Sequence, residues 1–186
     1  MSTPRPWRLV RSHIAFKHKW YTLRRDEVEL PNGHMVDDFF VSERPDGAYV
    51  FPVTEQQEVL FVRQYKHAAR KVFLELPAGS FFPDQEQAQD AATRELLEET
   101  GAVLTQPLIP LGVLHDNPAK DTNRLHLFLA QNVRIEQAQL LDVTEDIEVV
   151  RVPIDQVLPK IMDGEICVSG SVAISFLALK HLQALK

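Results

Sequence analysis

The sequence predicts an α+β protein, and three observations carry that prediction. Apolar runs that alternate with polar residues recur along most of the chain, as at Leu125, Leu127 and Leu129, which is the period-2 pattern of buried strands. A charged amphipathic run that stops at Gly101 predicts one central helix. Two further helical runs follow near the carboxyl end. Strands that outnumber helices in this way indicate α+β architecture.

Residues 1–45 predict a small antiparallel sheet ahead of the main domain. Asn32-Gly33 favours a tight hairpin between two of its strands. The turn signal at residues 44–47 (Arg-Pro-Asp-Gly) then marks a boundary near residue 45. The strand-like runs before this boundary are 8–16, 19–30 and 35–41. We therefore expect an N-terminal β-region at 1–45 and a second domain at 46–186.

The second domain predicts further strands and two late helices. Residues 155–163 read as a helix that Gly164 ends, and Ser169 or Ser171 caps a final helix through about residue 182. The predicted strands are 48–54, 58–65, 72–76, 108–116, 124–133 and 146–153.

The central helix carries an unusual concentration of acidic residues. Glu95, Glu98 and Glu99 are three and four residues apart, so they share one face of the helix, where like charges cost about 0.2–0.5 kcal/mol per pair. Arg94 is four residues from Glu98 and offsets part of this cost. A hard divalent cation, Mg²⁺ or Mn²⁺, would offset more, because such ions prefer oxygen ligands and bridge to phosphates. The alternative is a solvated acidic helix face.

The order of residues around this helix resembles the Nudix box, G-x5-E-x7-R-E-U-x-E-E-x-G-U, where U is aliphatic. Residues 79–102 follow that pattern with one departure: six residues, not five, separate Gly79 from Glu86. Gln85 stands where strict counting places the first glutamate. Helical register back from Arg94 favours Glu86 and puts the extra residue in the preceding loop.

Membership of the Nudix hydrolases would imply an α/β/α sandwich with a mixed central sheet, whose metal site is formed by the box helix and the loop before it. The resemblance implies that Glu95, Glu98 and Glu99 hold two or three Mg²⁺ ions. It adds the backbone carbonyl of Ala78 as a ligand and gives Arg94 the task of holding a carboxylate in place.

Further similarity points to the ADP-ribose and nucleotide-sugar pyrophosphatase branch of this family. That branch has an N-terminal β-region that helps to form a homodimer, and residues 7–42 match such a region in size. Pro118, seventeen residues after Gly101, resembles a marker of ADP-ribose hydrolases, although a lone proline is also an ordinary turn residue. The similar runs are 62–79, 115–130, 144–150 and 161–179.

The general base implied by the resemblance is a loop glutamate, and Glu145 matches it best, with Asp146 and Glu148 beside it. An exposed acidic turn before a strand is the alternative. Glu75 is expected to orient Arg94 or to lie near the metals, or simply to be a buried strand-end carboxylate.

The candidate substrate-binding residues are Lys66, Arg63 and Trp20. Lys66 stands where relatives carry a phosphate-facing arginine, and a lysine lacks the bidentate fork of arginine. Arg63 is a second cationic candidate, although strand alternation can direct it to solvent. Trp20, Tyr21 and Phe39 are aromatic candidates for base stacking, with a role in a dimer core as the alternative.

Composition excludes several classes of protein. A net charge of −6 and a pI of about 5.6 disfavour a nucleic-acid binder. There is no apolar run of about 18 residues to span a membrane, and the amino terminus has no signal-peptide core. The one cysteine, Cys167, fits a reducing cytoplasmic location. His115 and His126 lack metal-ligand spacing and are expected to be structural.

Three hypotheses follow for the function. The first is Mg²⁺-dependent hydrolysis of the pyrophosphate bond of ADP-ribose or a related nucleoside diphosphate sugar, giving a nucleoside monophosphate and a sugar phosphate. The second keeps the chemistry and changes the substrate to GDP-mannose, a dinucleotide or a nucleoside triphosphate. The third is a nucleotide-sugar sensor without turnover, which the intact carboxylate cluster disfavours.

Overall fold

A computed structural model describes residues 3–18 and 21–184 of the chain, and Trp20 lies outside the described residues. Contacts divide the chain into two compact units. Unit 1 comprises residues 1–45 and 115–123, and unit 2 comprises residues 46–114 and 124–186.

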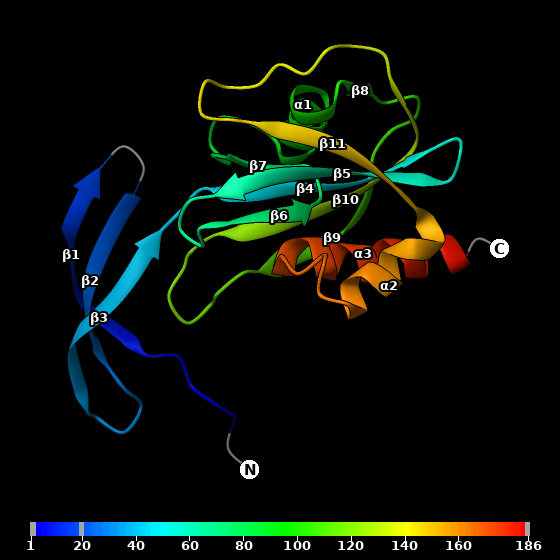
Figure 1. Cartoon of the computed structure of the whole chain (residues 1–186). Coiled ribbons are helices and arrows are strands. Elements are labelled where there is room, and N and C mark those ends of the chain that lie inside the picture. Colours follow the sequence, from blue (N-terminus) through cyan, green and yellow to red (C-terminus); the bar gives the residue numbers. More distant parts are fainter. Residues whose placement is uncertain (1–2, 19–20, 185–186) are drawn as a thin grey trace. The chain divides into compact units, whose positions relative to one another are not determined.

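Unit 1 is built on a three-stranded antiparallel sheet in the order β1-β2-β3 (Figure 1). The turn between β2 and β3 contains Gly33 at φ +83°, a conformation that glycine adopts without steric cost. The segment 115–123 joins this unit because Ser42 donates its N–H to the carbonyl of Lys120 (2.7 Å) and accepts the N–H of Thr122 (3.1 Å). The strands are β1 (Arg8–His18), β2 (Tyr21–Glu29) and β3 (Met35–Glu43).

Unit 2 contains a mixed eight-stranded sheet. Its main path runs β11-β5-β4-β10-β8, with β6 paired to β5, β7 to β4 and β9 to β10. The β4–β10 pair is parallel and the β4–β5, β5–β6, β5–β11 and β4–β7 pairs are antiparallel. The strands are β4 (Asp46–Thr54), β5 (Glu58–Lys66), β6 (Lys71–Glu75), β7 (Ala78–Phe81), β8 (Ala102–Val103), β9 (Ile109–His115), β10 (Arg124–Ile135) and β11 (Ile147–Pro153).

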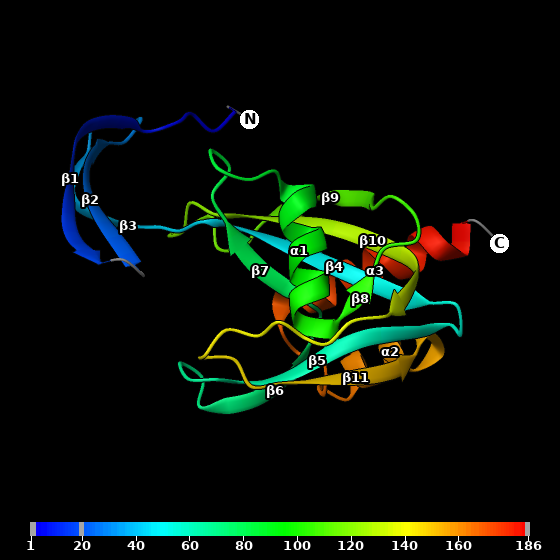
Figure 2. The same cartoon turned by 90° about the horizontal axis from the view of Figure 1, so that it is seen from above.

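Helices cover both faces of this sheet (Figures 1 and 2). On one face lies α1 (Ala88–Thr100), and on the other lie α2 (Val157–Met162), which follows a 3₁₀ turn at Ile154–Gln156, and α3 (Ser169–Ala184). Each face has its own apolar core, as alternation along the strands requires: Leu60 packs towards α1, whereas Phe61 belongs to the core of α3. The predicted α+β sandwich with a mixed sheet is confirmed.

Two short strands were not predicted. The residues after Pro77 were expected to form a loop, but Ala78–Phe81 form β7 because they pair with the first half of β4. Ala102–Val103 form β8 by pairing with the end of β10. Both segments depend on partners far away in sequence, which local pattern does not report.

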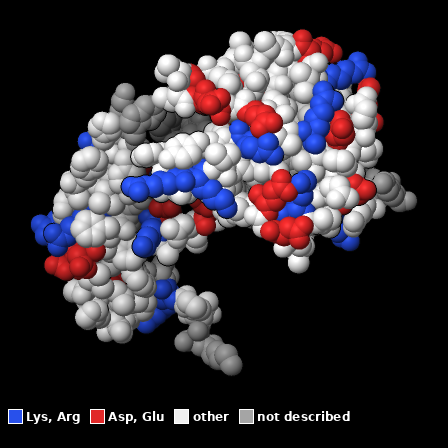
Figure 3. Space-filling model, viewed as in Figure 1, with Lys and Arg blue, Asp and Glu red and all other residues white. Residues whose placement is uncertain are grey.

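Two further observations concern the helices and the distribution of surface charge. No helix within residues 3–18 and 21–184 is long and apolar enough to cross a membrane. On the face shown in Figure 3, Lys and Arg side chains are interspersed with Asp and Glu side chains.

Candidate active site

The site is organised on the polar side of α1. The helix ends because Gly101 adopts φ +68°, and its N–H caps the carbonyl of Leu97. A Cβ at Gly101 would lie 2.0 Å from the carbonyl oxygen of Gln137, so close packing as well as backbone conformation requires glycine here.

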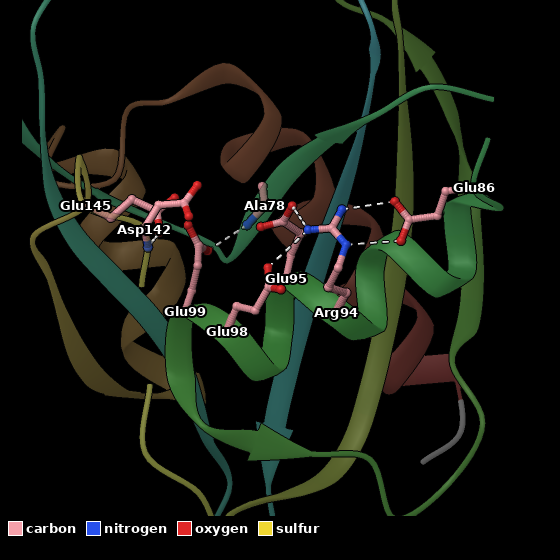
Figure 4. Close-up of polar contacts among 8 residues, drawn as sticks. All are labelled: Ala78, Glu86, Arg94, Glu95, Glu98, Glu99, Asp142 and Glu145. Carbon is pink, nitrogen blue, oxygen red and sulfur yellow. Dashed lines mark hydrogen bonds and ion pairs between the residues drawn. The ribbon is translucent and has the colours of Figure 1, made fainter. Parts of the chain in front are cut away.

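Arg94 holds three carboxylates at once (Figure 4). Its Nε and Nη2 each donate to Glu86 at 3.0 Å, which is a bidentate contact. Its Nη1 donates to Glu95 at 2.6 Å and to Glu98 at 3.0 Å. These contacts raise the pKa of Arg94 further above its already high ordinary value, chiefly through the hydrogen bonds to Glu86. The guanidinium is therefore a fixed charge that orients the acidic face.

The same contact identifies the first glutamate of the box. Glu86, not Gln85, faces Arg94, and Gln85 is exposed. The extra residue lies in the turn between β7 and α1, as helical register from Arg94 favours, although Glu86 itself precedes the first turn of the helix. Hydrogen bonds from Arg94 hold the pKa of Glu86 below its ordinary value despite some burial.

Gly79 makes room for Glu95. A Cβ on Gly79 would lie 1.8 Å from Oε1 of Glu95, so any side chain there would displace the carboxylate. The strand β7 therefore forms a backbone cradle against which Glu95 is buried. This explains in steric terms why a glycine begins the motif.

Glu99 is the most buried of the three helix carboxylates. It is 3% exposed, and its Oε2 accepts the N–H of Ala78 at 3.0 Å. Burial raises its pKa to about 8, and the charges of Glu95 and Glu75 act in the same direction. Burial likewise raises the pKa of Glu95. A bound cation would favour the ionised form of both buried carboxylates, so Glu95 and Glu99 are a candidate site for a positive charge.

Lys66 and Glu75 form an ion pair beside Glu99. Lys66 Nζ lies 3.0 Å from Glu75 Oε1, although that buried oxygen makes no hydrogen bond with proper geometry. Glu75 thus binds Lys66 and does not orient Arg94. The hydrogen bonds of Arg94 go to Glu86, Glu95 and Glu98. Both charges act on Glu99.

Arg63 is directed away from this site. It pairs across β5–β11 with Glu148, at 2.7 Å. Its neighbour Phe61, two residues away on the same face of β5, belongs to the core under α3. Strand alternation therefore places Arg63 on the face opposite α1.

Glu145 lies in the loop before β11 and approaches the cluster (Figure 4). Its carboxylate accepts the N–H of Asp142 at 2.9 Å, and its charge acts on Glu95. The loop is tied to the end of α1 because Gln139 Nε2 donates to the carbonyl of Glu99 at 2.6 Å.

The remaining candidates are two aromatic residues, two histidines and a proline. Tyr21 and Phe39 belong to unit 1, where Phe39 packs edge-to-face on Trp7 at 5.5 Å. His126 binds Asp46 at 2.9 Å and packs on the ring of Phe81. Such contacts are those of a structural histidine. His115 and Pro118 lie in the segment 115–123 of unit 1.

The donor set fits a hard divalent cation, with a rearrangement. Glu95, Glu98 and Glu99 supply carboxylate oxygens from one helix face, and Glu75 contributes an oxygen without a hydrogen-bond donor. Within residues 3–18 and 21–184, no three His, Cys, Asp or Glu side chains are already gathered as a metal site. Arg94 occupies two of the carboxylates, so a cation would have to compete with its guanidinium for them.

Comparison with known proteins identifies the family. A model of the NUDIX domain matches residues 43–166, and a model described as the nucleoside diphosphate sugar hydrolase N-terminal domain matches residues 7–42. The chain belongs to the NUDIX family. The family predicted from the box is thereby confirmed, and the chain is a Nudix hydrolase, a class that generally depends on a divalent metal.

Two curated relatives are similar to nearly the whole chain. The ADP-ribose pyrophosphatase of Bacillus subtilis (strain 168) is 30% identical over 174 residues, covering 92% of each chain. The methanol dehydrogenase activator of Bacillus methanolicus is 30% identical over 180 residues, covering 92% of this chain and 95% of that protein. A crystal structure of an ADP compounds hydrolase superposes with a TM-score of 0.85 at 20% identity, covering 100% of this chain and 98% of the other, which supports the fold.

Proposed function

We propose that this Nudix hydrolase cleaves the pyrophosphate bond of ADP-ribose or a related nucleoside diphosphate sugar, giving a nucleoside monophosphate and a sugar phosphate. The observation that carries the proposal is the pair of buried carboxylates Glu95 and Glu99 in a Nudix domain. Arg94 and the Gly79 cradle position Glu95, and the N–H of Ala78 positions Glu99. The N-terminal match to nucleoside diphosphate sugar hydrolases and the similarity to ADP-ribose pyrophosphatases support the choice of substrate.

Mg²⁺, or Mn²⁺ in its place, is the cofactor we propose. Glu95, Glu98 and Glu99 would hold it, with the backbone carbonyl of Ala78 as a further ligand. When bound, such an ion neutralises the diphosphate and lowers the pKa of the water that attacks phosphorus. Arg94 positions Glu95 and Glu98 before the cation binds and would yield them to it, keeping its bidentate contact with Glu86.

Two protein side chains have proposed roles towards the substrate itself. Glu145 would accept the proton of the attacking water, because its carboxylate approaches the cluster from a separate loop. Lys66 would contact a phosphate, exchanging its ion pair with Glu75 for one with the substrate. Arg63, on the other face of the sheet, is left out of the proposed site.

We further propose a homodimer formed through residues 1–45, in the cytoplasm, with no nucleic-acid partner. Large apolar side chains that are 43–56% exposed support the dimer, because such side chains favour burial against a partner. These side chains, on the first three strands and just before them, are Trp7, Leu9, Val10, Ile14, Phe16, Tyr21, Met35 and Phe40.

A product assay tests the activity. Purified protein with Mg²⁺ is incubated with ADP-ribose, GDP-mannose, ADP-glucose, NADH, diadenosine polyphosphates and nucleoside triphosphates, and the products are identified by mass. AMP and ribose 5-phosphate, formed fastest from ADP-ribose, are expected. Faster cleavage of GDP-mannose would move the protein to that substrate, and no turnover of any compound would refute the enzymatic proposal.

Similarity to a methanol dehydrogenase activator supports a second candidate, in which the chain acts on a dehydrogenase. The discriminating observation is the rate of a purified alcohol dehydrogenase with and without this protein. Stimulation that survives in the Glu99→Gln variant would favour a binding role over hydrolysis.

A further inference from the structure

The loop between β10 and β11, residues 136–146, is fastened to the last turn of α1. The final carbonyls of a helix have no partner within the helix, and here this distant loop supplies the donors. Leu140 donates its N–H to the carbonyl of Glu98 at 2.9 Å, and Gln139 Nε2 donates to the carbonyl of Glu99 at 2.6 Å. The helical turn that presents two of the proposed metal ligands is therefore also the support of this loop.

The side chain of Gln139 makes a second contact with the same nitrogen. Its Nε2 donates to the carbonyl of Ile147 at 3.2 Å, at the residue where β11 begins. An amide NH₂ group has two hydrogens, so it can serve the carbonyls of Glu99 and Ile147 at once. One partly buried side chain therefore joins the loop, the end of α1 and the start of β11.

The segment between these attachments, residues 140–146, carries Glu145. Asp142 donates its N–H to the Glu145 carboxylate at 2.9 Å, and its carbonyl accepts the N–H of Glu145 at 2.9 Å, which closes a tight turn. The charge of this carboxylate acts on Glu95 across the site (Figure 4). The place of Glu145 relative to α1 thus depends on how the two ends of the segment are held.

The other bonds between the loop and α1 do not hold this segment by a side chain. The carbonyl of Gly101 accepts the N–H groups of Glu136 and Gln137, both at 3.1 Å, but these residues precede Gln139. The bond from Leu140 is made by its backbone, so it does not depend on which side chain stands there. The amide of Gln139 is therefore the attachment that a substitution can remove.

We propose that Gln139 is a positioning residue for hydrolysis, whose amide holds the loop so that Glu145 faces the carboxylates of α1. The inference rests on the proposed function for the role of Glu145. A general base must lie within hydrogen-bond reach of the water, and a misplacement of about 1 Å can cost about 100-fold in rate. Local sequence pattern does not report Gln139, because its partners are backbone carbonyls 40 and 8 residues away.

The test uses two variants that keep the approximate size of Gln139 and lose its hydrogen-bond donors. Gln139→Met has no polar hydrogen, and Gln139→Glu keeps the shape but only accepts hydrogen bonds when ionised. Each is expected to lower kcat for ADP-ribose in Mg²⁺ by about 10- to 100-fold. In Gln139→Met, the KM and the Mg²⁺ concentration that gives half the maximal rate should change less than about 2-fold, because binding is left intact. Gln137→Met and Gln137→Glu are the matched controls, since Gln137 is an exposed glutamine of the same loop, and they should keep the wild-type kcat.

A double-mutant cycle identifies the residue through which Gln139 acts. When Glu145→Gln has already removed the base, adding Gln139→Met should lower kcat less than about 2-fold further, because the two residues act as a unit. A purely structural role would lower kcat by the same factor in both backgrounds. Amide hydrogen exchange of residues 140–147 gives a readout without substrate, and it should become faster in Gln139→Met and not in Gln137→Met.

The outcomes separate this inference from the proposed function. The inference alone would be overturned by wild-type kcat in the Gln139 variants, equal losses in the Gln137 variants, a changed Mg²⁺ requirement in Gln139→Met, or unchanged hydrogen exchange. Independent losses from Gln139→Met and Glu145→Gln, or near-normal kcat in Glu145→Gln, would also overturn it while the hydrolase activity stands. A wild-type protein that cleaves no nucleotide sugar would refute the proposed function, and the inference with it.

Discussion

Replacing Glu99 by glutamine should stabilise the metal-free protein while destroying its activity. The amide of the Glu99→Gln variant would keep an oxygen to accept the N–H of Ala78, as Glu99 Oε2 does at 3.0 Å. The substitution would remove a carboxylate that is 3% exposed and that burial keeps protonated up to a pKa of about 8. Glutamine has the same shape as glutamate and carries no charge. The substitution therefore removes the cost that ionisation of Glu99 imposes on folding and keeps the other contacts.

The size of the expected stabilisation follows from the raised pKa of Glu99. At pH below the ordinary value of 4.5, Glu99 is neutral in both the folded and the unfolded chain, so its ionisation costs nothing. As the pH rises to about 8, the unfolded chain ionises and the folded chain does not, so the free energy of unfolding falls. At about 1.4 kcal/mol per pH unit, the full penalty is about 3–5 kcal/mol. For a chain of this length each kcal/mol is worth about 2–4 °C in Tm.

The assay is thermal unfolding at pH 5 and pH 8, in EDTA and in Mg²⁺. In EDTA, Glu99→Gln should raise Tm at pH 8 and have little effect at pH 5. Mg²⁺ should raise the Tm of the wild type at pH 8 by binding to the folded state, and should raise that of the variant much less. Turnover of ADP-ribose should fall by orders of magnitude. A variant less stable than the wild type at pH 8 in EDTA, or one with near-normal turnover, would refute the reasoning.

Three other substitutions have defined expectations. Gly79→Ala should abolish turnover by displacing Glu95 while the protein stays folded by circular dichroism; retained activity would contradict the cradle. Gly101→Ala should lower the free energy of unfolding by at least about 1 kcal/mol, measured by urea denaturation, because it needs a positive φ and meets a carbonyl oxygen. Burial raises the pKa of Asp46, but hydrogen bonds from His126 and Arg124 outweigh burial and hold that pKa below its ordinary value of 3.8. The Asp46 carboxylate therefore stabilises the fold above about pH 4, and this stabilisation is lost as the pH falls further. Asp46→Asn should cost about 1–3 kcal/mol at pH 7 and flatten the acid limb of the Tm profile, and an unchanged limb would count against the hydrogen bonds.

Local sequence pattern determined the parts of this protein that depend on neighbours along the chain. The period of α-helices is enough to put Glu95, Glu98 and Glu99 on one face, and glycine chemistry is enough to end the helix at Gly101. The box spacing was also enough to identify the family and, with the register of Arg94, to favour Glu86 over Gln85. Apolar alternation predicted most strands, and the end signal at Gly164 and the capping serines predicted both late helices.

Contacts between distant segments decided the rest. Ala78–Phe81 became a strand only because β4 offers it a partner, and Glu75 met Lys66 instead of Arg94 because the two strands of a hairpin bring them together. The exclusion of Arg63 depends on which face of the sheet α1 covers. A sequence specifies the alternation of a strand, but only tertiary packing assigns its two faces. On β5 that assignment places Lys66 beside Glu99 and Arg63 on the opposite face.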